Sequence, residues 1–246
     1  MMQTLPITQV LPQVKQELLH NNRLVLQAPP GAGKTTALPL ALLDEPWLEG
    51  KQIIMLEPRR LAVRSSAARM AELLGEKVGQ RIGYQIKMES VQSKETKILI
   101  VTEGILTRKL QSDPSLEDIA LVIFDEFHER SIHADLSLAL CLESQSILRE
   151  DLKLLIMSAT LNTHAISKLL YNAPIIESEG RTYPVERIYL DPNTAQPSKK
   201  ELPHYIARKL MHILEKEEGN VLVFLSGIRE IKTVEKLLKA SKPNDV

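Results

Sequence analysis

The chain has 246 residues, of which 43% are hydrophobic and 25% charged, and its 31 basic side chains balance 31 acidic ones. This composition is ordinary for a folded globular protein and excludes a disordered or fibrous chain. A net charge of zero supplies no global field to attract nucleic acid, so any polyanion must be held by a local basic patch.

The N-terminus lacks the basic flank and apolar run of a signal peptide. No apolar stretch approaches the roughly eighteen residues that span a bilayer. Cys141 is the single cysteine and lies in an apolar run, which favours a small buried side chain over a nucleophile. We therefore expect a soluble, cytoplasmic protein with no membrane partner.

Apolar runs alternate with helical patterns over most of the chain, as is typical of a parallel sheet covered by helices. The runs are nearly continuous rather than alternating, which indicates strands buried on both faces. Strands are predicted at 23–28, 51–57, 96–102, 121–126 and 152–159. Helices are predicted at 34–44, 60–74, 103–111, 132–149 and 162–171. These elements predict a doubly wound α/β domain over residues 1–180.

Glycine, proline and other turn-forming residues then replace the helical periodicity, and we place a linker at 181–200. Beyond it come a helical segment at 201–217, a strand-like run at 221–226 and a helix starting near Ile228. One strand and two helices bury too little apolar surface to stand as a domain. Residues 201–246 are therefore predicted to be the incomplete beginning of a second α/β domain.

A glycine-rich stretch directly follows the first strand and matches the phosphate-binding loop pattern, apart from Ala28 at the first glycine position. Gly31 and Gly33 let backbone N–H groups point at phosphate oxygens. Lys34 places a positive charge on the phosphates, and the Thr35 hydroxyl can bind Mg²⁺. The residues predicted to bind nucleotide are Pro30, Gly31, Ala32, Gly33, Lys34, Thr35 and Thr36. A mere glycine-rich turn with a surface lysine is disfavoured, because the motif falls where this fold places it.

Two adjacent carboxylates follow the fourth predicted strand. Asp125 is placed to hold Mg²⁺, and Glu126 to orient and deprotonate an attacking water. A solvated strand end is a weak alternative, because two acids facing the phosphates repel each other without a metal. His128 and His133 lack the spacing of a helical zinc protease. We interpret His128 as a contact across a domain interface and His133 as a structural histidine.

Eight stretches stand in the order and at the spacing typical of one helicase family. They are the phosphate loop, LEPRRLAVRSSAARMA (56–71), RIGYQI (81–86), TEGIL (102–106), DEFHER (125–130), SAT (158–160), GRTYPV (180–185) and VLVFLSG (221–227). The set resembles the DEAH-type RNA helicases, and the Asp-Glu-Phe-His variant resembles the bacterial HrpB group. The resemblance covers a complete first RecA-like domain and only the opening strand of a second.

The resemblance implies further roles outside the phosphate site. It implies that His128 links the nucleotide state to a partner domain and that Ser158 and Thr160 couple hydrolysis to strand movement. A hydroxyl-bearing helix cap is favoured for SAT taken alone. Roughly thirty residues beyond an Asp-Glu pair in a P-loop protein, the coupling role is favoured instead, and the two interpretations are compatible. Arg69 matches the position that lies against the adenine ring, although Arg64 is on the same predicted helix.

The predicted nucleic-acid contacts are Arg59, Arg60 and Thr102, at the ends of the second and third predicted strands. Arginine can fork onto phosphate oxygens, while threonine positions a single strand without reading its bases. The residue types alone fit a solvent-facing helix cap equally well, and the resemblance favours the RNA path. Because aromatic residues make up only 4% of the chain, base stacking is not expected to be a main source of affinity.

The resemblance predicts an ATP-dependent RNA helicase that binds ATP, Mg²⁺ and single-stranded RNA and works with further helicase domains. No Gln-Arg-x-Gly-Arg motif, whose arginines complete the charge on the transferred phosphate, follows residue 227. The isolated chain is therefore expected to bind nucleotide and hydrolyse it slowly. The alternative function is a catalytically deficient ATP- and nucleic-acid-binding module. A nucleotide kinase or a GTPase is disfavoured, because no acceptor site, lid or Asn-Lys-x-Asp guanine motif is recognisable.

Overall fold

The structure is a computed structural model in which residues 5–159, 163–180, 184–190 and 196–241 are described. The chain divides into two compact units, Met1–Tyr183 and Pro184–Val246. Thr160, to which the resemblance gives a coupling role, lies outside the described residues. Within the described parts of the chain, no helix is both long enough and apolar enough to cross a membrane.

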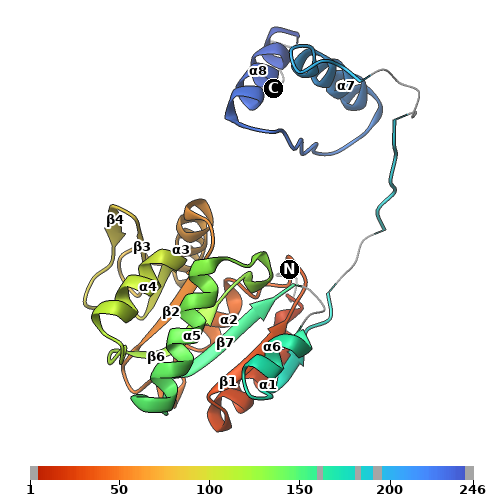
Figure 1. Cartoon of the computed structure of the whole chain (residues 1–246). Helices are drawn as coiled ribbons and strands as arrows, with labels where there is room; N and C mark the ends of the chain where they lie inside the picture. Colours follow the sequence, from red (N-terminus) through yellow and green to blue (C-terminus); the bar gives the residue numbers. More distant parts are fainter. Residues whose placement is uncertain (1–4, 160–162, 181–183, 191–195, 242–246) are drawn as a thin grey trace. The chain divides into compact units, whose positions relative to one another are not determined.

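One eight-stranded sheet forms the centre of the first unit, in the order β4-β3-β5-β2-β6-β7-β1-β8 (Figure 1). Its strands are β1 (Arg23–Gln27), β2 (Gln52–Glu57), β3 (Ile82–Ile86), β4 (Glu89–Val91), β5 (Ile98–Thr102), β6 (Ile119–Phe124), β7 (Lys153–Ser158) and β8 (Ile175–Glu177). All pairings are parallel except the antiparallel β3–β4 pair. The predicted α/β fold with a mostly parallel sheet is therefore confirmed.

Helices cover both faces of this sheet (Figure 1). They are α1 (Ile7–His20), α2 (Ala37–Ala41), α3 (Arg60–Leu74), α4 (Glu103–Ser112), α5 (Ile132–Ile147) and α6 (Thr163–Leu169), with 3₁₀ turns η1 (Pro46–Leu48) and η2 (Phe127–Glu129). One hydrophobic core lies under α1, α2 and α3, and a second lies under α4, α5 and α6. Successive strand residues point to opposite faces. Leu24 and Leu26 of β1 accordingly join the first core, and Val25 joins the second.

The helix predicted at 34–44 is shorter than expected and begins only at Ala37. Pro39 explains this start, because proline has no N–H to donate. A helix beginning at Lys34 would need that N–H to bond the carbonyl of Thr35, whereas in a helix beginning at Ala37 residue 39 lies in the first turn and needs no partner. The phosphate loop therefore extends through Thr36 as turns.

One α-helix and three strands of the first unit were not predicted from the sequence: α1, β3, β4 and β8. The strands β4 and β8 have three residues each, too few to show a periodicity. Both are stabilised by their neighbours in the sheet, β4 by pairing with β3 and β8 by pairing with β1. Their existence depends on pairing rather than on local sequence.

The second unit contains a pair of packed helices, α7 (Leu202–Lys216) and α8 (Ile228–Ser241). The strand predicted at 221–226 is wrong, because that segment pairs with no described residue and exposes 79% of Leu222 and 88% of Phe224. A strand needs a hydrogen-bonded neighbour, and the described residues of this unit form no other strand. Ala207, Leu210 and Val234 are the buried apolar residues of α7 and α8.

Candidate functional site

The sheet register brings the predicted nucleotide residues to one edge. Strands β1, β2, β5, β6 and β7 are parallel, so their carboxyl ends lie together. Gln27 lies opposite Ser158, and Glu57 lies opposite Thr102. The phosphate loop follows β1, and Asp125 follows β6. This edge therefore collects the loop, the acidic pair and the residues predicted to contact RNA, as expected for ligand sites of open α/β sheets.

The phosphate loop depends on two glycines with positive φ, Gly31 at 78° and Gly33 at 94°. A Cβ on Gly33 would lie 2.8 Å from Leu5 Cδ1 and 3.1 Å from Ile7 Cγ2. The Ile7 N–H also donates to the Ala32 carbonyl over 3.0 Å. The start of α1 thus packs against the loop and leaves no space for a side chain at Gly33.

A third glycine approaches the loop from the other end of the unit. A Cβ on Gly180 would lie 2.0 Å from Pro29 Cγ, far inside the distance that real atoms adopt. Sequence reasoning assigned no role to Gly180. The signal was present in the GRTYPV stretch, which begins with this residue.

Buried Lys34 and partly exposed Glu126 form an ion pair at this edge. The Lys34 Nζ lies 2.7 Å from Glu126 Oε1, and the lysine is 3% exposed. The other carboxylate oxygen, Oε2, lies 3.3 Å from His128 Nε2. The Ala159 N–H points at His128 Nδ1 over 3.4 Å, so Nδ1 is the acceptor and Nε2 carries the hydrogen facing Glu126. Both oxygens of Glu126 are therefore engaged by the protein itself.

The Thr35 hydroxyl donates to Asp125 Oδ2 over 2.5 Å, which joins the two residues predicted to hold Mg²⁺. The Glu126 N–H donates to Asp125 Oδ1 over 2.8 Å, and the Asp125 N–H donates to the Leu56 carbonyl over 3.1 Å. Burial raises the pKa of Asp125, opposed by the Thr35 hydrogen bond and by the charge of Lys34.

Hydroxyl and carboxylate oxygens are the hard ligands that Mg²⁺ takes from proteins. No cluster of three or more His, Cys, Asp or Glu side chains suited to a metal occurs in the described ranges. Mg²⁺ commonly keeps several waters and binds through one or two protein oxygens plus substrate phosphates. Thr35 and Asp125 fit that pattern.

Sequence reasoning missed a third carboxyl group at this edge, that of Glu57. Because Leu56 pairs with Phe124, the next residues, Glu57 and Asp125, lie side by side. Glu57 is 3% exposed, and Ser66 Oγ lies 3.4 Å from its Oε1. Burial, with the charges of Asp125 and Glu126, raises the pKa of Glu57 to about 8. The sequence did hold a signal for this group, because Glu57 is an acidic residue at the end of an apolar, buried strand.

A cavity of about 440 Å³ lies beside this edge, between the end of β2 and helix α4. Arg60 and Thr102, two of the predicted RNA contacts, both line it. Lys87, Arg108 and His133 line it too, and sequence reasoning missed the first two as ligand contacts. The wall also includes Pro58, Glu103, Gly104, Ile105, Thr107 and Gln111. Three cationic side chains beside one acid form a local basic patch in a chain with no net charge.

The third predicted RNA contact, Arg59, is not among the residues lining that cavity, and its Nη2 lies 2.6 Å from Glu129 Oε1. Arg69, matched to the adenine position, is exposed on α3 and pairs with Glu72 over 2.6 Å. Ser158 is fully buried at the end of β7. The structure thus groups Arg60 with Thr102 and gives Arg59 and Arg69 acidic partners within the protein.

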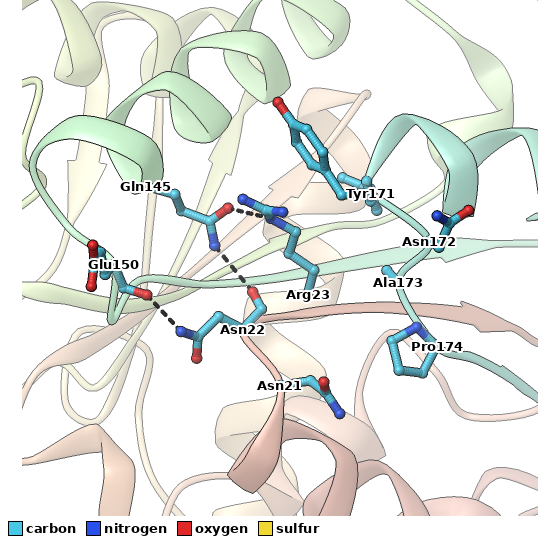
Figure 2. A pocket seen from close by; sticks show the side chains of 10 residues that line it. Asn21, Asn22, Arg23, Gln145, Glu150, Tyr171, Asn172, Ala173 and Pro174 are labelled. Carbon is cyan, nitrogen blue, oxygen red and sulfur yellow. Dashed lines mark hydrogen bonds between the residues drawn. The ribbon is translucent and has the colours of Figure 1, made fainter.

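A separate cavity of about 340 Å³ lies at the amino ends of β1, β7 and β8, the opposite edge of the sheet (Figure 2). The Arg23 Nε donates to Gln145 Oε1 over 2.8 Å, and its guanidinium lies 4.5 Å from the Tyr171 ring centre. The Gln145 amide in turn donates to the carbonyls of Asn22 and Leu152. These contacts tie α5 to the sheet away from the phosphate loop.

Family, sequence and structure comparisons all match this chain to helicases. The family model of the DEAD/DEAH box helicases matches residues 8–169. The ATP-dependent RNA helicase HrpB of Escherichia coli is 47% identical over 245 residues, and HrpA of Borreliella burgdorferi is 37% identical over 237. A crystal structure of the E. coli DEAH/RHA helicase HrpB covers 96% of this chain with a TM-score of 0.88.

The matched relatives are much longer than this chain. The chain spans 30% of the E. coli HrpB sequence, 28% of the Borreliella HrpA sequence and 30% of the HrpB crystal-structure chain. The similarity therefore covers nearly all of this chain but less than a third of each relative.

Replacing Gly180 by alanine should weaken nucleotide binding on the order of tenfold, because the new Cβ must displace Pro29 and with it the phosphate loop. Gly104→Ala is the matched control, since a Cβ there meets nothing within 4 Å. Fluorescent-nucleotide titration measures both variants. Equal affinities for the two variants would show that the Gly180 contact does not shape the loop.

Replacing Glu57 by glutamine should stabilise the chain at alkaline pH in the absence of Mg²⁺ and nucleotide. Folding raises the pKa of the Glu57 carboxyl from 4.5 to about 8. Between these pH values the folded chain keeps a proton on Glu57 that the unfolded chain releases. The wild-type residue therefore costs stability increasingly as pH rises through that window. Urea unfolding at pH 5 and pH 8.5 should show a gain on the order of 1–3 kcal/mol that appears only at the higher pH.

Glu95→Gln is the control for that experiment, because Glu95 is exposed and remote in the fold from the acidic edge. It should change the free energy of unfolding equally little at both pH values. A Glu57→Gln gain of the same size at pH 5 and pH 8.5 would contradict the ionisation argument.

Proposed function

The chain belongs to the DEAD/DEAH box helicase family, and from this premise we propose that it forms the ATP-binding part of an ATP-dependent RNA helicase. The observation that carries the proposal is the shared sheet edge. Lys34, Thr35, Asp125 and Glu126 meet there, directly beside a cavity lined by three basic side chains. A phosphate site and a basic groove on one rigid sheet are suited to coupling ATP hydrolysis to a bound strand.

The Lys34–Glu126 ion pair supports a defined change on nucleotide binding. The phosphates of ATP compete with Glu126 for the single ammonium group of Lys34, which lies 2.7 Å from the carboxylate. Once Lys34 binds phosphate, Glu126 is free to accept a proton from water as that water attacks the γ-phosphorus and ADP leaves. His128, which holds the other oxygen of Glu126, orients the carboxylate.

We propose that Thr35 and Asp125 hold Mg²⁺ together with the phosphates, as their oxygens already lie 2.5 Å apart. When bound, the metal neutralises charge that develops on the phosphate oxygens. The protein contributes the placement of these oxygens: the Asp125 N–H is tied to Leu56 in the sheet, and the Thr35 hydroxyl is tied to Asp125.

For the strand, we propose that Arg60, Lys87 and Arg108 bind RNA phosphates in the groove, with Thr102 positioning the backbone. Among its described residues, the groove lining contains no Phe, Tyr or Trp, and His133 is its one aromatic ring, so base stacking contributes little there. Such binding would be independent of sequence and would weaken steeply with salt. We propose RNA rather than DNA as the strand, because the similar HrpB and HrpA proteins are ATP-dependent RNA helicases.

We propose that helicase work requires further domains. The relatives are more than three times as long, and the described second unit is a helix pair with an unpaired 221–226 segment. The charge-completing arginines of this kind of ATPase come from a second domain and contribute several orders of magnitude in rate. The alternative function, an ATP- and nucleic-acid-binding module without turnover, fits the same features.

Lys34→Ala should lower the affinity for ATP by roughly tenfold to a hundredfold, because it removes the charge-assisted contact to the phosphates. Isothermal titration with a non-hydrolysable ATP analogue and Mg²⁺ measures the change. Lys51→Ala is the control, since Lys51 is partly exposed and pairs with Asp151 rather than with a residue of the loop. Unchanged affinity in Lys34→Ala would remove the phosphate-loop assignment.

Glu126→Gln should leave ATP binding nearly intact and lower hydrolysis by about a hundredfold or more, because the amide cannot accept the proton of water. Steady-state phosphate release with and without single-stranded RNA measures it. The unaltered chain should turn over slowly under both conditions. Brisk RNA-stimulated hydrolysis by the chain alone would contradict the need for a second domain, whereas RNA and ATP binding without turnover would favour the binding-module alternative.

A further inference from the structure

Arg59 and Glu129 connect the strand groove to the catalytic edge. Arg59 is the second residue after β2 and precedes Arg60 of the groove, while Glu129 belongs to the η2 turn after β6. Their charged atoms, Nη2 and Oε1, lie 2.6 Å apart across 70 residues of sequence. The arginine side chain is 72% exposed and that of Glu129 is 34% exposed. Solvent and any bound polyanion can therefore reach the pair.

The η2 turn that carries Glu129 directly follows the predicted catalytic carboxylate. Glu126 stands immediately before it with φ 49°, and Arg130 stands immediately after it with φ 47°. Positive φ at residues other than glycine costs energy and persists only where surrounding contacts impose it. The contacts at this turn include the ion pairs Lys34–Glu126, Arg130–Asp135 and Arg59–Glu129. Loss of any one of them weakens the constraint on Glu126.

We propose that the Arg59–Glu129 ion pair is a latch that a phosphate of bound single-stranded RNA opens, with Glu129 as a positioning residue for the turn. This inference rests on the proposed function. The guanidinium of Arg59 is one donor group for which Glu129 and a phosphate compete. Exposed ion pairs are weak, whereas arginine binds phosphate through two parallel hydrogen bonds, so the exchange is favourable.

The latch couples RNA to nucleotide through one turn. ATP phosphates withdraw Lys34 from Glu126, and an RNA phosphate withdraws Arg59 from Glu129, three residues further along. Each ligand removes one cation that holds the same constrained turn, so the second ligand has less to displace. By linkage the two ligands raise each other's affinity, and the shared element is η2.

The test measures binding of a fluorescein-labelled single-stranded oligouridine to the 246-residue chain by anisotropy, with and without Mg²⁺ and a non-hydrolysable ATP analogue. Glu129→Gln should tighten RNA binding about two- to fivefold, the range that exposed ion pairs give. The same substitution in an Arg59→Ala background should change nothing. The gain in RNA affinity that the nucleotide produces should shrink in Glu129→Gln.

Glu89→Gln is the matched control, because Glu89 pairs with exposed Arg64 in the same kind of Glu–Arg bridge. It should leave RNA affinity unchanged. Equal gains in Glu89→Gln and Glu129→Gln, or a Glu129→Gln gain that survives Arg59→Ala, would overturn the latch. An RNA affinity that Glu129→Gln leaves unchanged would also overturn the latch, but it would not contradict the proposed function. Absence of RNA binding by the unaltered chain would overturn the proposed function and the latch together.

Discussion

At the carboxyl edge of the sheet, carboxyl groups outnumber the one buried ammonium group. Lys34 is 3% exposed and acts on Glu126 and Asp125, while Glu57, a third carboxyl group, lies beside Asp125. A buried charge must be paired, and surplus carboxylates in a low dielectric repel one another. Burial, with repulsion between the carboxylates as a smaller cause, raises the pKa of Glu57 and that of Asp125. An edge with more carboxyl groups than cationic groups is suited to binding a divalent cation.

This imbalance makes the site responsive to its ligands. The Lys34–Glu126 pair is the resting arrangement of two groups that each have another partner in the proposed reaction, phosphate for one and water for the other. Rigid strands hold the backbone on both sides, since Asp125 continues the ladder onto Leu56 and Ala28 donates to the Ser158 carbonyl over 3.0 Å. Side chains can therefore exchange partners without refolding of the sheet.

The same edge explains how a chain with no net charge could hold a polyanion. Parallel pairing places the carboxyl ends of β2 and β5 next to each other, where Thr102 ends β5 and Arg60 begins α3 after β2. The β3–β4 pair adds Lys87 in its turn, and α4 adds Arg108. The basic patch is thus a product of strand order, because its residues are scattered over some fifty positions of sequence.

Sequence alone determined the parts of this protein that depend on local chemistry. The buried strands β1, β2, β5, β6 and β7 show as continuous apolar runs, and Gly31, Gly33 and Lys34 show as a loop of fixed spacing. Tertiary structure decided what depends on pairing across the sheet. Only the alignment of β2 with β6 places Glu57 beside Asp125, and β4 and β8 exist only because a neighbour offers hydrogen bonds. The apolar run 221–226 forms no strand because no described neighbour pairs with it, since backbone N–H and C=O groups need a partner that one segment cannot supply.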